Sequence, residues 1–254
     1  MFLLVIIIVI YILSQIPCLS RAFSSASNLF LPAPSFPVIF DAKRERSQPM
    51  HIPTCETNAL DILEFEPALA IANQPSPDYD ITKWLYVPNF YSEYRYILGT
   101  RGKKPLICVG INPSTAAPDD LDNTLKSVER IALHNGYDSF IMFNVYAQRA
   151  TNPDDMEQTY NMQLHQENMK AFAYALSLDQ DNAPAIWAAW GTIIEKRDYL
   201  PDCVKDMIAI GSTYHARWFS AGKRSKKGHP HHPLYLRKDS LLEHFDVERY
   251  VNTI

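Results

Sequence analysis

Polar segments follow four short apolar runs of this 254-residue chain, and their residue types could do chemistry. The run PLICVGI leads to Asn112, SFIMFNV contains Asn144, and AIWAAW is closed by Gly191. The fourth run, MIAIG, leads through a basic loop to a histidine-rich segment, residues 228–235. Amides can bind or orient a small polar molecule, and an imidazole can donate a proton near neutral pH. Ligands bind beyond the carboxyl ends of strands in open parallel sheets, so we expect these segments at one rim of a sheet.

The histidine-rich segment does not have the pattern of a metal site. His229, His231 and His232 are close in sequence, but adjacent histidines point apart and no carboxylate cluster accompanies them. The four cysteines are far apart and form no CxxC pair, which argues against a zinc ribbon and against a disulfide scaffold. We therefore expect neither a metal nor a cofactor.

The basic loop before the histidines could bind phosphate. Aromatic Trp218 and Phe219 are interleaved with its cations, which are Arg217, Lys223, Arg224, Lys226 and Lys227. The whole chain has a net charge of −4, so nucleic-acid binding would rest on this local patch alone. The alternative interpretation is a solvated surface loop.

Composition is that of a folded protein with an N-terminal extension. With 47% hydrophobic and 20% charged residues, the chain is too apolar for overall disorder. Residues 1–40 start with an apolar run too short to span a bilayer, followed by a Ser-rich, acid-poor stretch. This resembles a two-part presequence and predicts an organelle, plastid or mitochondrion. The alternatives are the secretory pathway and a membrane anchor.

The remainder of the chain divides into two parts. Residues 41–80 are rich in proline and are expected to be a linker or packing arm, and residues 81–254 a single α/β domain. After removal of the presequence we expect no stable membrane partner. The sequence leaves the oligomeric state open.

Within the domain, expected strands alternate with expected helices, which predicts a three-layer α/β/α fold. The sheet should have four or five mostly parallel strands, including Ile107–Ile111, Ile141–Asn144, Ile186–Trp190 and Met207–Ile210. Tyr94–Leu98 should form a hairpin with the strand that follows it. Helices are expected at Asp122–Asn135, where Asp122 is the candidate N-cap, at Met156–Leu178 and at Ile193–Asp198.

Four motifs between residues 94 and 236 resemble those of the uracil-DNA glycosylase superfamily, in the same order. GINPS is similar to the loop that positions the hydrolytic water in the mismatch-specific enzymes, and SFIMFNV to the strand that ends in a base-reading asparagine. AIWAAWG resembles the LWG segment, and HPHHPLY the HPSPL motif. Separately, GINPSTA, FNVYAQRATNP, AAWG and HPHHPLYL closely match domain of unknown function 1643. The first resemblance implies a uracil-DNA glycosylase-like fold.

The glycosylase resemblance also implies a role for each motif. Asn112 would orient a water through its carbonyl oxygen, and Asn144 would read a base edge with its amide while Tyr146 stacks on the base. His232, or His229 if HPHHPLY is aligned by its first His-Pro, would stabilise the departing base. Three residues of the GINPS loop would complete the base pocket: Ile111, Pro113 and Ser114.

Each of these roles has a structural alternative. Asn112 could brace its loop, Asn144 could satisfy buried backbone groups, and Tyr146 could pack in the core. At the level of function, the sequence predicts a base-excising hydrolase that acts on nucleic acid. The alternatives are a hydrolase or transferase of free nucleosides or nucleotides, and a non-catalytic module that binds nucleic acid or nucleotides.

Overall fold

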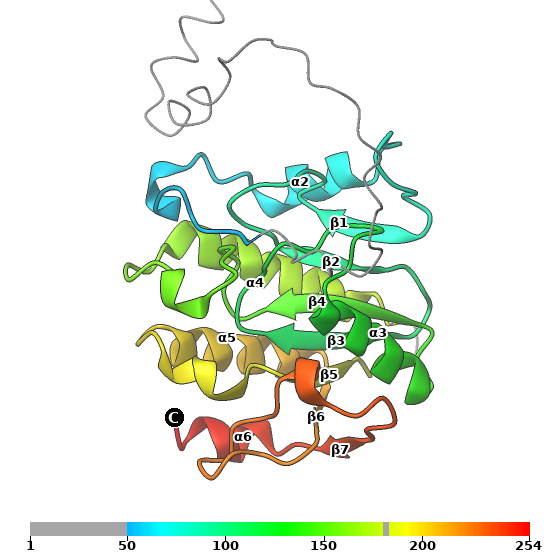
Figure 1. The fold of residues 1–254 in the computed structure, drawn as a ribbon, viewed down its shortest axis with the longest axis vertical. Coiled ribbons are helices and arrows are strands. Elements are labelled where there is room, and N and C mark those ends of the chain that lie inside the picture. The colour runs from blue at the N-terminus through cyan, green and yellow to red at the C-terminus, as the bar shows by residue number, and fades with distance from the viewer. Residues whose placement is uncertain (1–49, 180–182) are drawn as a thin grey trace, which may run out of the picture. The chain divides into compact units, whose positions relative to one another are not determined.

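The computed structural model describes residues 50–179 and 183–254, which carry a seven-stranded mixed sheet with helices on both faces (Figure 1). By their contacts, these residues belong to one unit. The expected presequence, residues 1–40, lies outside the described residues. No helix in the described ranges is long and apolar enough to cross a bilayer.

The centre of the sheet is parallel and its margins are antiparallel. Four strands pair in parallel in this order: β4 (Ser139–Asn144), β3 (Pro105–Gly110), β5 (Ala185–Ala188) and β6 (Arg217–Ala221). The antiparallel strands are β1 (Trp84–Val87) and β2 (Ile97–Thr100) beside β4, and β7 (Leu242–His244) beside β6. The expected sheet of four or five mostly parallel strands is therefore wrong: among the described residues there are seven strands, with three parallel and three antiparallel pairings.

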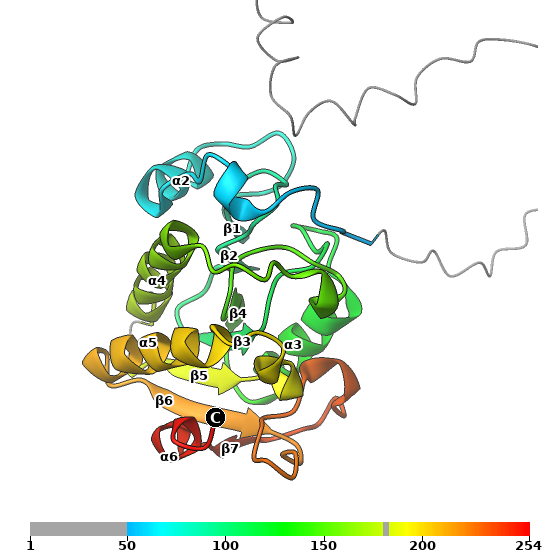
Figure 2. The same ribbon diagram turned by 90° about the vertical axis from the view of Figure 1, so that its left-hand side faces the viewer.

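The two faces of the sheet are covered unequally (Figure 2). One face carries α2 (Phe65–Ala72), α4 (Met162–Ser177), α5 (Leu200–Thr213) and α6 (Val247–Val251), and the other carries α3 (Asn123–His134). Short 3-10 turns complete the described structure: η1 (Thr57–Ala59), η2 (Pro153–Asp155), η3 (Gly191–Glu195) and η4 (Pro233–Tyr235). Every residue of β3, β4 and β5 is buried, as expected for strands covered on both faces.

The segment Met207–Ile210, predicted as a strand, belongs to α5. The buried residues of α5 recur at intervals of three and four, which is the spacing of one helical face: Leu200, Cys203, Val204, Met207, Ile208 and Gly211. The short apolar run is therefore the end of a longer helical pattern. The fourth parallel strand is β6, which follows α5 and begins the basic loop.

The predicted hairpin between Tyr94–Leu98 and the next strand is also wrong. β4 lies between β2 and β3, so that Met142 pairs with Leu98 on one side and with Cys108 on the other. β2 instead forms its hairpin with β1. After the edge hairpin, the chain forms β3 in the centre of the sheet. It then forms β4, which occupies the position between β2 and β3.

The helix predictions hold to different degrees. Asp122–Asn135 is confirmed as α3, and the Leu125 backbone N–H donates to Asp122 Oδ1 at 2.8 Å, which is an N-cap bond. The helix predicted at Met156–Leu178 begins later, at Met162. At Ile193–Asp198 the structure has the end of a 3-10 turn, η3, in place of an α-helix.

Two buried glutamates attach residues 57–72 to the rest of the protein. Glu157 accepts hydrogen bonds from the Thr57 backbone N–H at 2.8 Å and from its hydroxyl at 2.7 Å. Glu167 accepts from the Phe65 backbone N–H at 2.8 Å, at the start of α2. Hydrogen bonds to carboxylates are stronger than neutral ones, so these bonds hold the segment against α4 and the sheet.

Glycine substitutions should distinguish the sheet from the helix that replaces the predicted strand. A Cβ at Gly99 in β2 would lie 2.3 Å from the Phe140 carbonyl oxygen in β4, so Gly99→Ala should cost about 1–3 kcal/mol of unfolding free energy or more. At Gly211 in α5 the nearest atom would be 3.5 Å away. Gly211→Ala should therefore be neutral or stabilise by up to about 1 kcal/mol, because alanine is the better helix former. Urea unfolding measures both, and equal losses would contradict the assignment of α5.

Candidate functional site

A cavity of about 600 Å³ lies where β3 and β5 end, and its volume is in the range of small-molecule sites. Its lining comes from loops that are distant in sequence. The main contributions are Ile111, Asn112 and Ser114 after β3, the first turn of α3, Trp190 and Gly191 after β5, and His232 with Leu234 and Tyr235 at η4. The structure therefore brings three of the four polar segments together at one cavity.

Asn112 braces its loop and also presents an acceptor. Its side-chain nitrogen donates to the Ala150 carbonyl at 2.7 Å and to the Pro113 carbonyl at 3.1 Å. Both amide hydrogens are thus bound to backbone carbonyls, one in the loop itself and one in the segment after β4. Asn112 lines the cavity, and its Oδ1 atom accepts no hydrogen bond from the described residues, so an acceptor is available on this residue.

His232 lines the same cavity and presents a donor. Its Nδ1 accepts from the Leu234 backbone N–H at 3.3 Å, so the neutral ring carries its proton on Nε2. Burial lowers the pKa of His232, and the Asp122 carboxylate opposes this effect. The Cβ of a residue at position 191 would lie 3.8 Å from His232 Cβ, and Gly191 adopts a φ of 65° there. The sharp turn after β5 is thus packed against this histidine.

His229, the alternative histidine, lies outside the lining of this cavity. Its side chain is 1% exposed, and its Nδ1 is 2.8 Å from the Tyr250 hydroxyl. Its Nε2 lies 3.3 Å from a carboxylate oxygen of Glu195. The structure therefore places His232, and not His229, where a bound molecule could be reached.

Asn144 lies beneath the cavity rather than in its lining. The residue is fully buried beside Gly110, and its amide oriented to satisfy its neighbours donates to the Asn112 carbonyl at 3.2 Å and to the Phe143 carbonyl at 3.3 Å. A Cβ at Gly110 would lie 3.2 Å from the Asn144 amide, so the absent side chain lets this amide approach. Asn144 thus holds the backbone of the Asn112 loop from below.

Tyr146 is a core residue and does not reach the cavity. It is fully buried, its hydroxyl donates to Glu157, and the same hydroxyl accepts from the Asn161 backbone N–H at 3.0 Å. Burial raises the pKa of Tyr146 well above its usual range. The stacking role implied by the resemblance is therefore not available to it in this structure.

Ser114 links the cavity to the first described residues. Its hydroxyl is 3.1 Å from the Thr151 hydroxyl, and Thr151 accepts the His51 backbone N–H at 2.7 Å. Ile111 lines the cavity beside them, whereas Pro113 is buried behind it and accepts from the Ala150 backbone N–H at 2.9 Å. The GINPS loop is thus held by hydrogen bonds from two other segments.

Sequence reasoning missed two buried arginines at this site. Arg95 lines the cavity although its residue is only 1% exposed, and Arg149 is fully buried behind the loop. An antiparallel bridge between Tyr94 and Gln148 places the two arginines on the same side, and both donate to the Ala116 carbonyl, at 3.0 and 3.5 Å. A signal was present in YRYIL, where one charged residue interrupts a run that is otherwise apolar and aromatic.

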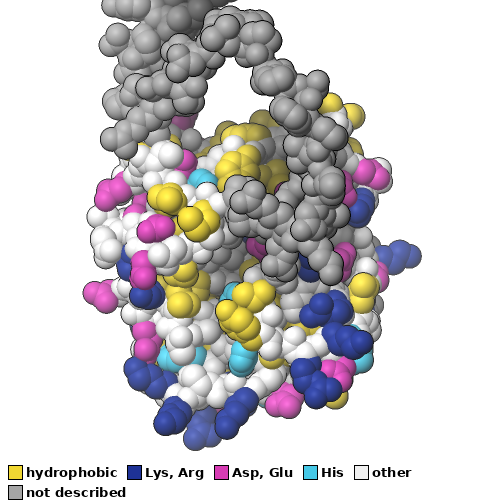
Figure 3. Space-filling model, in the orientation of Figure 1, with side chains coloured by type: hydrophobic (Ala, Val, Ile, Leu, Met, Phe, Trp, Pro, Cys, Tyr) yellow, Lys and Arg dark blue, Asp and Glu magenta, His cyan; other side chains and the backbone are white. Residues whose placement is uncertain are grey.

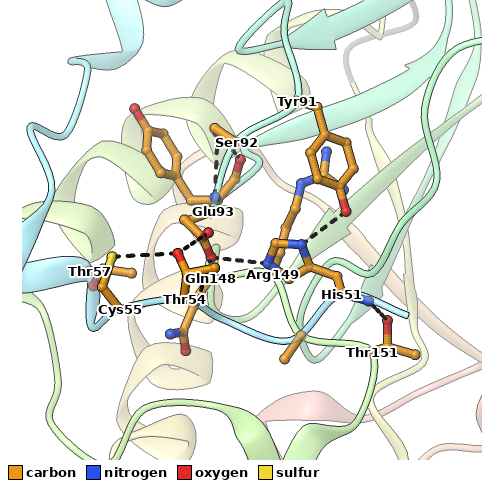
Figure 4. Close-up of polar contacts among 12 residues, drawn as sticks. His51, Thr54, Cys55, Thr57, Tyr91, Ser92, Glu93, Gln148, Arg149 and Thr151 are labelled. Atoms are coloured by element: carbon orange, nitrogen blue, oxygen red, sulfur yellow. Dashed lines mark hydrogen bonds and ion pairs between the residues drawn. The ribbon is translucent and has the colours of Figure 1, made fainter. Parts of the chain in front are cut away.

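The two guanidinium groups each have a carboxylate in their surroundings, Asp122 for Arg95 and Glu93 for Arg149, but in the described structure neither is in direct contact with one. Neither forms an ion pair within the described ranges, and the Nε atom of each has no hydrogen-bond partner there. Burial and the Arg149 cation lower the pKa of Arg95 to about 9, which still leaves it charged at neutral pH. The Cζ atom of Arg149 lies 4.3 Å from the centroid of the Tyr91 ring. The Tyr91 hydroxyl is 3.0 Å from His51 Nδ1 (Figure 4).

The basic loop belongs to a different hollow. Arg224 and Lys227 line a second cavity of about 370 Å³, between this loop and α6. Lys227 pairs with Glu195 at 2.7 Å, and Lys223 and Lys226 are exposed. Lysines and arginines gather over this C-terminal end of the molecule in Figure 3. The sequence predicts that Arg217 belongs to the same patch as the loop. This is wrong, because Arg217 lies at the opposite, amino end of β6.

Metal ligands do not cluster in the described part of the chain: no three His, Cys, Asp or Glu side chains there could hold an ion together. The described residues thus define a mixed α/β protein with an amide acceptor, a neutral histidine and a buried arginine around one cavity at the strand ends. Residues 95–234 match the family described as protein of unknown function (DUF1643), and the chain belongs to this family. No curated protein and no solved structure matches the chain.

The family match confirms the resemblance to domain of unknown function 1643. It begins at Arg95 and ends at Leu234, so Asn112 and His232 both fall within it. The cavity is therefore built largely from the stretch that defines the family.

The titration of His232 tests the electrostatics of the cavity. Its pKa should lie below 6.5, and Asp122→Asn should lower it further because the carboxylate favours the charged ring. Asparagine keeps the N-cap of α3, so the helix should persist. Because folding favours the neutral ring, the stability that His232 contributes is complete above pH 6.5 and is lost as the pH falls below it.

Histidine NMR titration measures these values. Asp239→Asn, which removes a carboxylate paired with Arg237, is the matched control and should leave the His232 pKa unchanged. A His232 pKa at or above 6.5, or an increase in Asp122→Asn, would contradict this account.

Proposed function

We propose that the protein hydrolyses the N-glycosidic bond between a nucleobase and its sugar in nucleic acid, as its resemblance to the uracil-DNA glycosylases implies. The observation that carries the proposal is the placement of Asn112 and His232 on one cavity, one offering a free amide oxygen and the other an Nε2–H. Base excision needs an acceptor that orients the attacking water and a donor that stabilises the departing base.

The finer fold assignment is part of the same proposal. Four central parallel strands, with helices on both faces, support a uracil-DNA glycosylase-like three-layer core to which β1, β2 and β7 add antiparallel margins. The candidate site at the carboxyl ends of those central strands also agrees with the rule for open α/β sheets.

In the proposed reaction, the Asn112 Oδ1 accepts a hydrogen bond from a water molecule and aligns its oxygen with the anomeric carbon. The carbon–oxygen bond forms as the carbon–nitrogen bond breaks, and the electron pair of the broken bond moves to the base. His232 Nε2–H donates to a carbonyl oxygen of the base and stabilises the developing negative charge. The water proton passes to solvent or to the base. A neutral amide cannot remove that proton as a carboxylate would, so catalysis depends more heavily on the histidine.

Free nucleosides or nucleotides are a second candidate class of substrate. Asn144 lies below the cavity and Tyr146 lies in the core, so the two base-reading side chains implied by the resemblance do not line it. The loop cations line a separate hollow. Both observations favour a small substrate held by the cavity itself.

Base release tests the proposed chemistry. Labelled oligonucleotides containing uracil or mismatches are incubated with the protein and then treated with alkali, while free nucleosides and nucleotides are assayed for released base. His232→Gln and Asn112→Ala should each lower the rate of base release by about 100-fold or more. His134→Gln, a change at an exposed residue at the end of α3, outside both cavities, is the matched control and should keep the rate. Base release from no substrate, or full activity in both variants, would contradict the proposal.

The basic loop tests whether the substrate is a polynucleotide. Changing Lys223, Arg224 and Lys226 to Gln should weaken DNA binding and flatten its salt dependence, by about 0.9 in the log–log slope per phosphate contact on duplex DNA and about 0.7 on single strands. Arg217→Gln, at the other end of β6, should leave the slope unchanged. Fluorescence anisotropy across a salt series measures both. An unchanged slope in the loop variant would favour free nucleotides.

A further inference from the structure

We propose that the cavity contains an anion subsite, in which Arg95 binds a terminal phosphate monoester of the ligand. This proposal does not rest on the glycosidic-bond chemistry, because it concerns how a ligand is held and not which bond is broken. It is carried by the burial and partners of Arg95, by the helix end that shares its cavity, and by the depth at which the arginine lies.

Arg95 is a buried cation with unused donors. A guanidinium has five N–H donors, but the hydrogen bond found for this side chain is the one from Nη1 to the Ala116 carbonyl, at 3.0 Å. Its Nε has no partner among the described residues, and the residue is 1% exposed. Arg149 adds a second positive charge nearby. Burying unpaired charge is costly, so an anion bound at this point would stabilise the folded protein.

The first turn of α3 faces the same cavity and favours negative charge. Asn123 and Thr124 line the cavity at the start of this twelve-residue helix, where backbone N–H groups have no partners within the helix. The Leu125 N–H is the one capped by Asp122. The backbone N–H groups at this helix end and the guanidinium of Arg95 can therefore both donate hydrogen bonds to one anionic group of a ligand.

The balance of charge favours a phosphate monoester. Within the lining, the Asp122 carboxylate stands against the Arg95 guanidinium and the positive end of α3, and behind the lining the Arg149 cation is partly offset by Glu93. The net positive potential that remains suits a group with a charge of about −1.5 to −2 at neutral pH, which is that of a phosphate monoester.

The position of Arg95 indicates that the phosphate is terminal. Arg95 is 1% exposed and lines the cavity together with Gly110 and Met142, which belong to the sheet, whereas the lining residue Tyr235 is 79% exposed. A phosphate at Arg95 therefore lies at the inner end of the cavity, against the sheet. A phosphodiester within a continuous strand would have to pass its chain through that wall. The phosphate belongs either to a free nucleotide or to the end of a strand.

Calorimetric titration of the full chain tests the subsite. The probes are nucleoside 5′-monophosphates, the corresponding nucleosides, inorganic phosphate, and a short oligonucleotide with and without a terminal phosphate. The wild-type protein should bind a phosphate-bearing ligand at least tenfold more tightly than its dephosphorylated form, and Arg95→Met should abolish that preference. Arg95→Lys should keep part of it, and Arg130→Met, on the exposed face of α3, should keep all of it.

Thermal unfolding separates this role from a structural one. Without ligand, Arg95→Met should not lower the Tm, because the change removes an uncompensated buried charge, whereas inorganic phosphate should raise the Tm of the wild type more than that of Arg95→Lys. If Arg95→Met does not fold, the comparison of wild type with Arg95→Lys decides. The proposal would be overturned if the wild type bound nucleoside and monophosphate with equal affinity. It would also be overturned if both Arg95→Lys and Arg95→Met kept the full phosphate preference of the wild type.

Two further comparisons complete the test. Phosphate preference with free nucleotides assigns the subsite to a small molecule, and preference only with the oligonucleotide assigns it to a strand end. Asn112→Ala should lose base release and keep the phosphate preference. A protein that releases no base from any substrate but discriminates phosphate through Arg95 would refute the proposed hydrolysis and support the subsite.

Discussion

β3 hydrogen-bonds in parallel to β4 on one side and to β5 on the other, and the registers of these two pairings determine where three strands end. Gly110 is opposite Asn144, and Val109 is opposite Ala188. The segments that follow therefore emerge side by side, although they lie far apart in the sequence. Much of the candidate site depends on this alignment, because the lining segments after β3, β4 and β5 begin at these strand ends, and the histidine loop after β6 and Arg95 before β2 complete the cavity.

The same alignment gives Asn144 its role. It is the last residue of β4 and lies against a glycine, so its amide reaches the carbonyl of Asn112 in the next strand's loop. A buried polar group must be hydrogen-bonded, and here the bond fixes the backbone of the residue that presents an acceptor to the cavity. The asparagine of the FNV motif supports the loop from within the fold. In this respect the structure departs from the base-reading role that the glycosylase resemblance implies.

How far the sequence predicts this structure depends on whether the signal is local. β3, β4 and β5 are continuous apolar runs, and α3 has a recognisable cap, so both could be identified from the sequence. The strand predicted at Met207–Ile210 is wrong because a short apolar run is compatible with a strand or a helix, and only the positions back to Leu200 show the helical period. The antiparallel margins depend on long-range pairing, which no local pattern of residues specifies.

The candidate site shows the same division. Asn112 and His232 could be placed at one rim because the topology of parallel sheets is general. The contribution of Arg95 could not be predicted. Its position depends on a bridge between residues 94 and 148, and an entire βαβ unit separates these two residues in the sequence. The sequence likewise could not decide which of His229 and His232 lines the cavity. The decision depends on Tyr250 of the C-terminal helix α6, whose hydroxyl is in hydrogen-bond contact with the buried His229.

The hydrogen bonds of Glu157 and Glu167 have a consequence for how the protein can be shortened. Their partners, Thr57 and Phe65, precede the first strand, so a fragment starting at residue 81 would lose these donors, although Glu157 would keep the Tyr146 hydroxyl and Glu167 would keep Lys170. Each lost hydrogen bond to a carboxylate would cost about 1.5–3 kcal/mol, a large part of the stability of an ordinary domain. The residues before the sheet must therefore be retained in any minimal folded fragment.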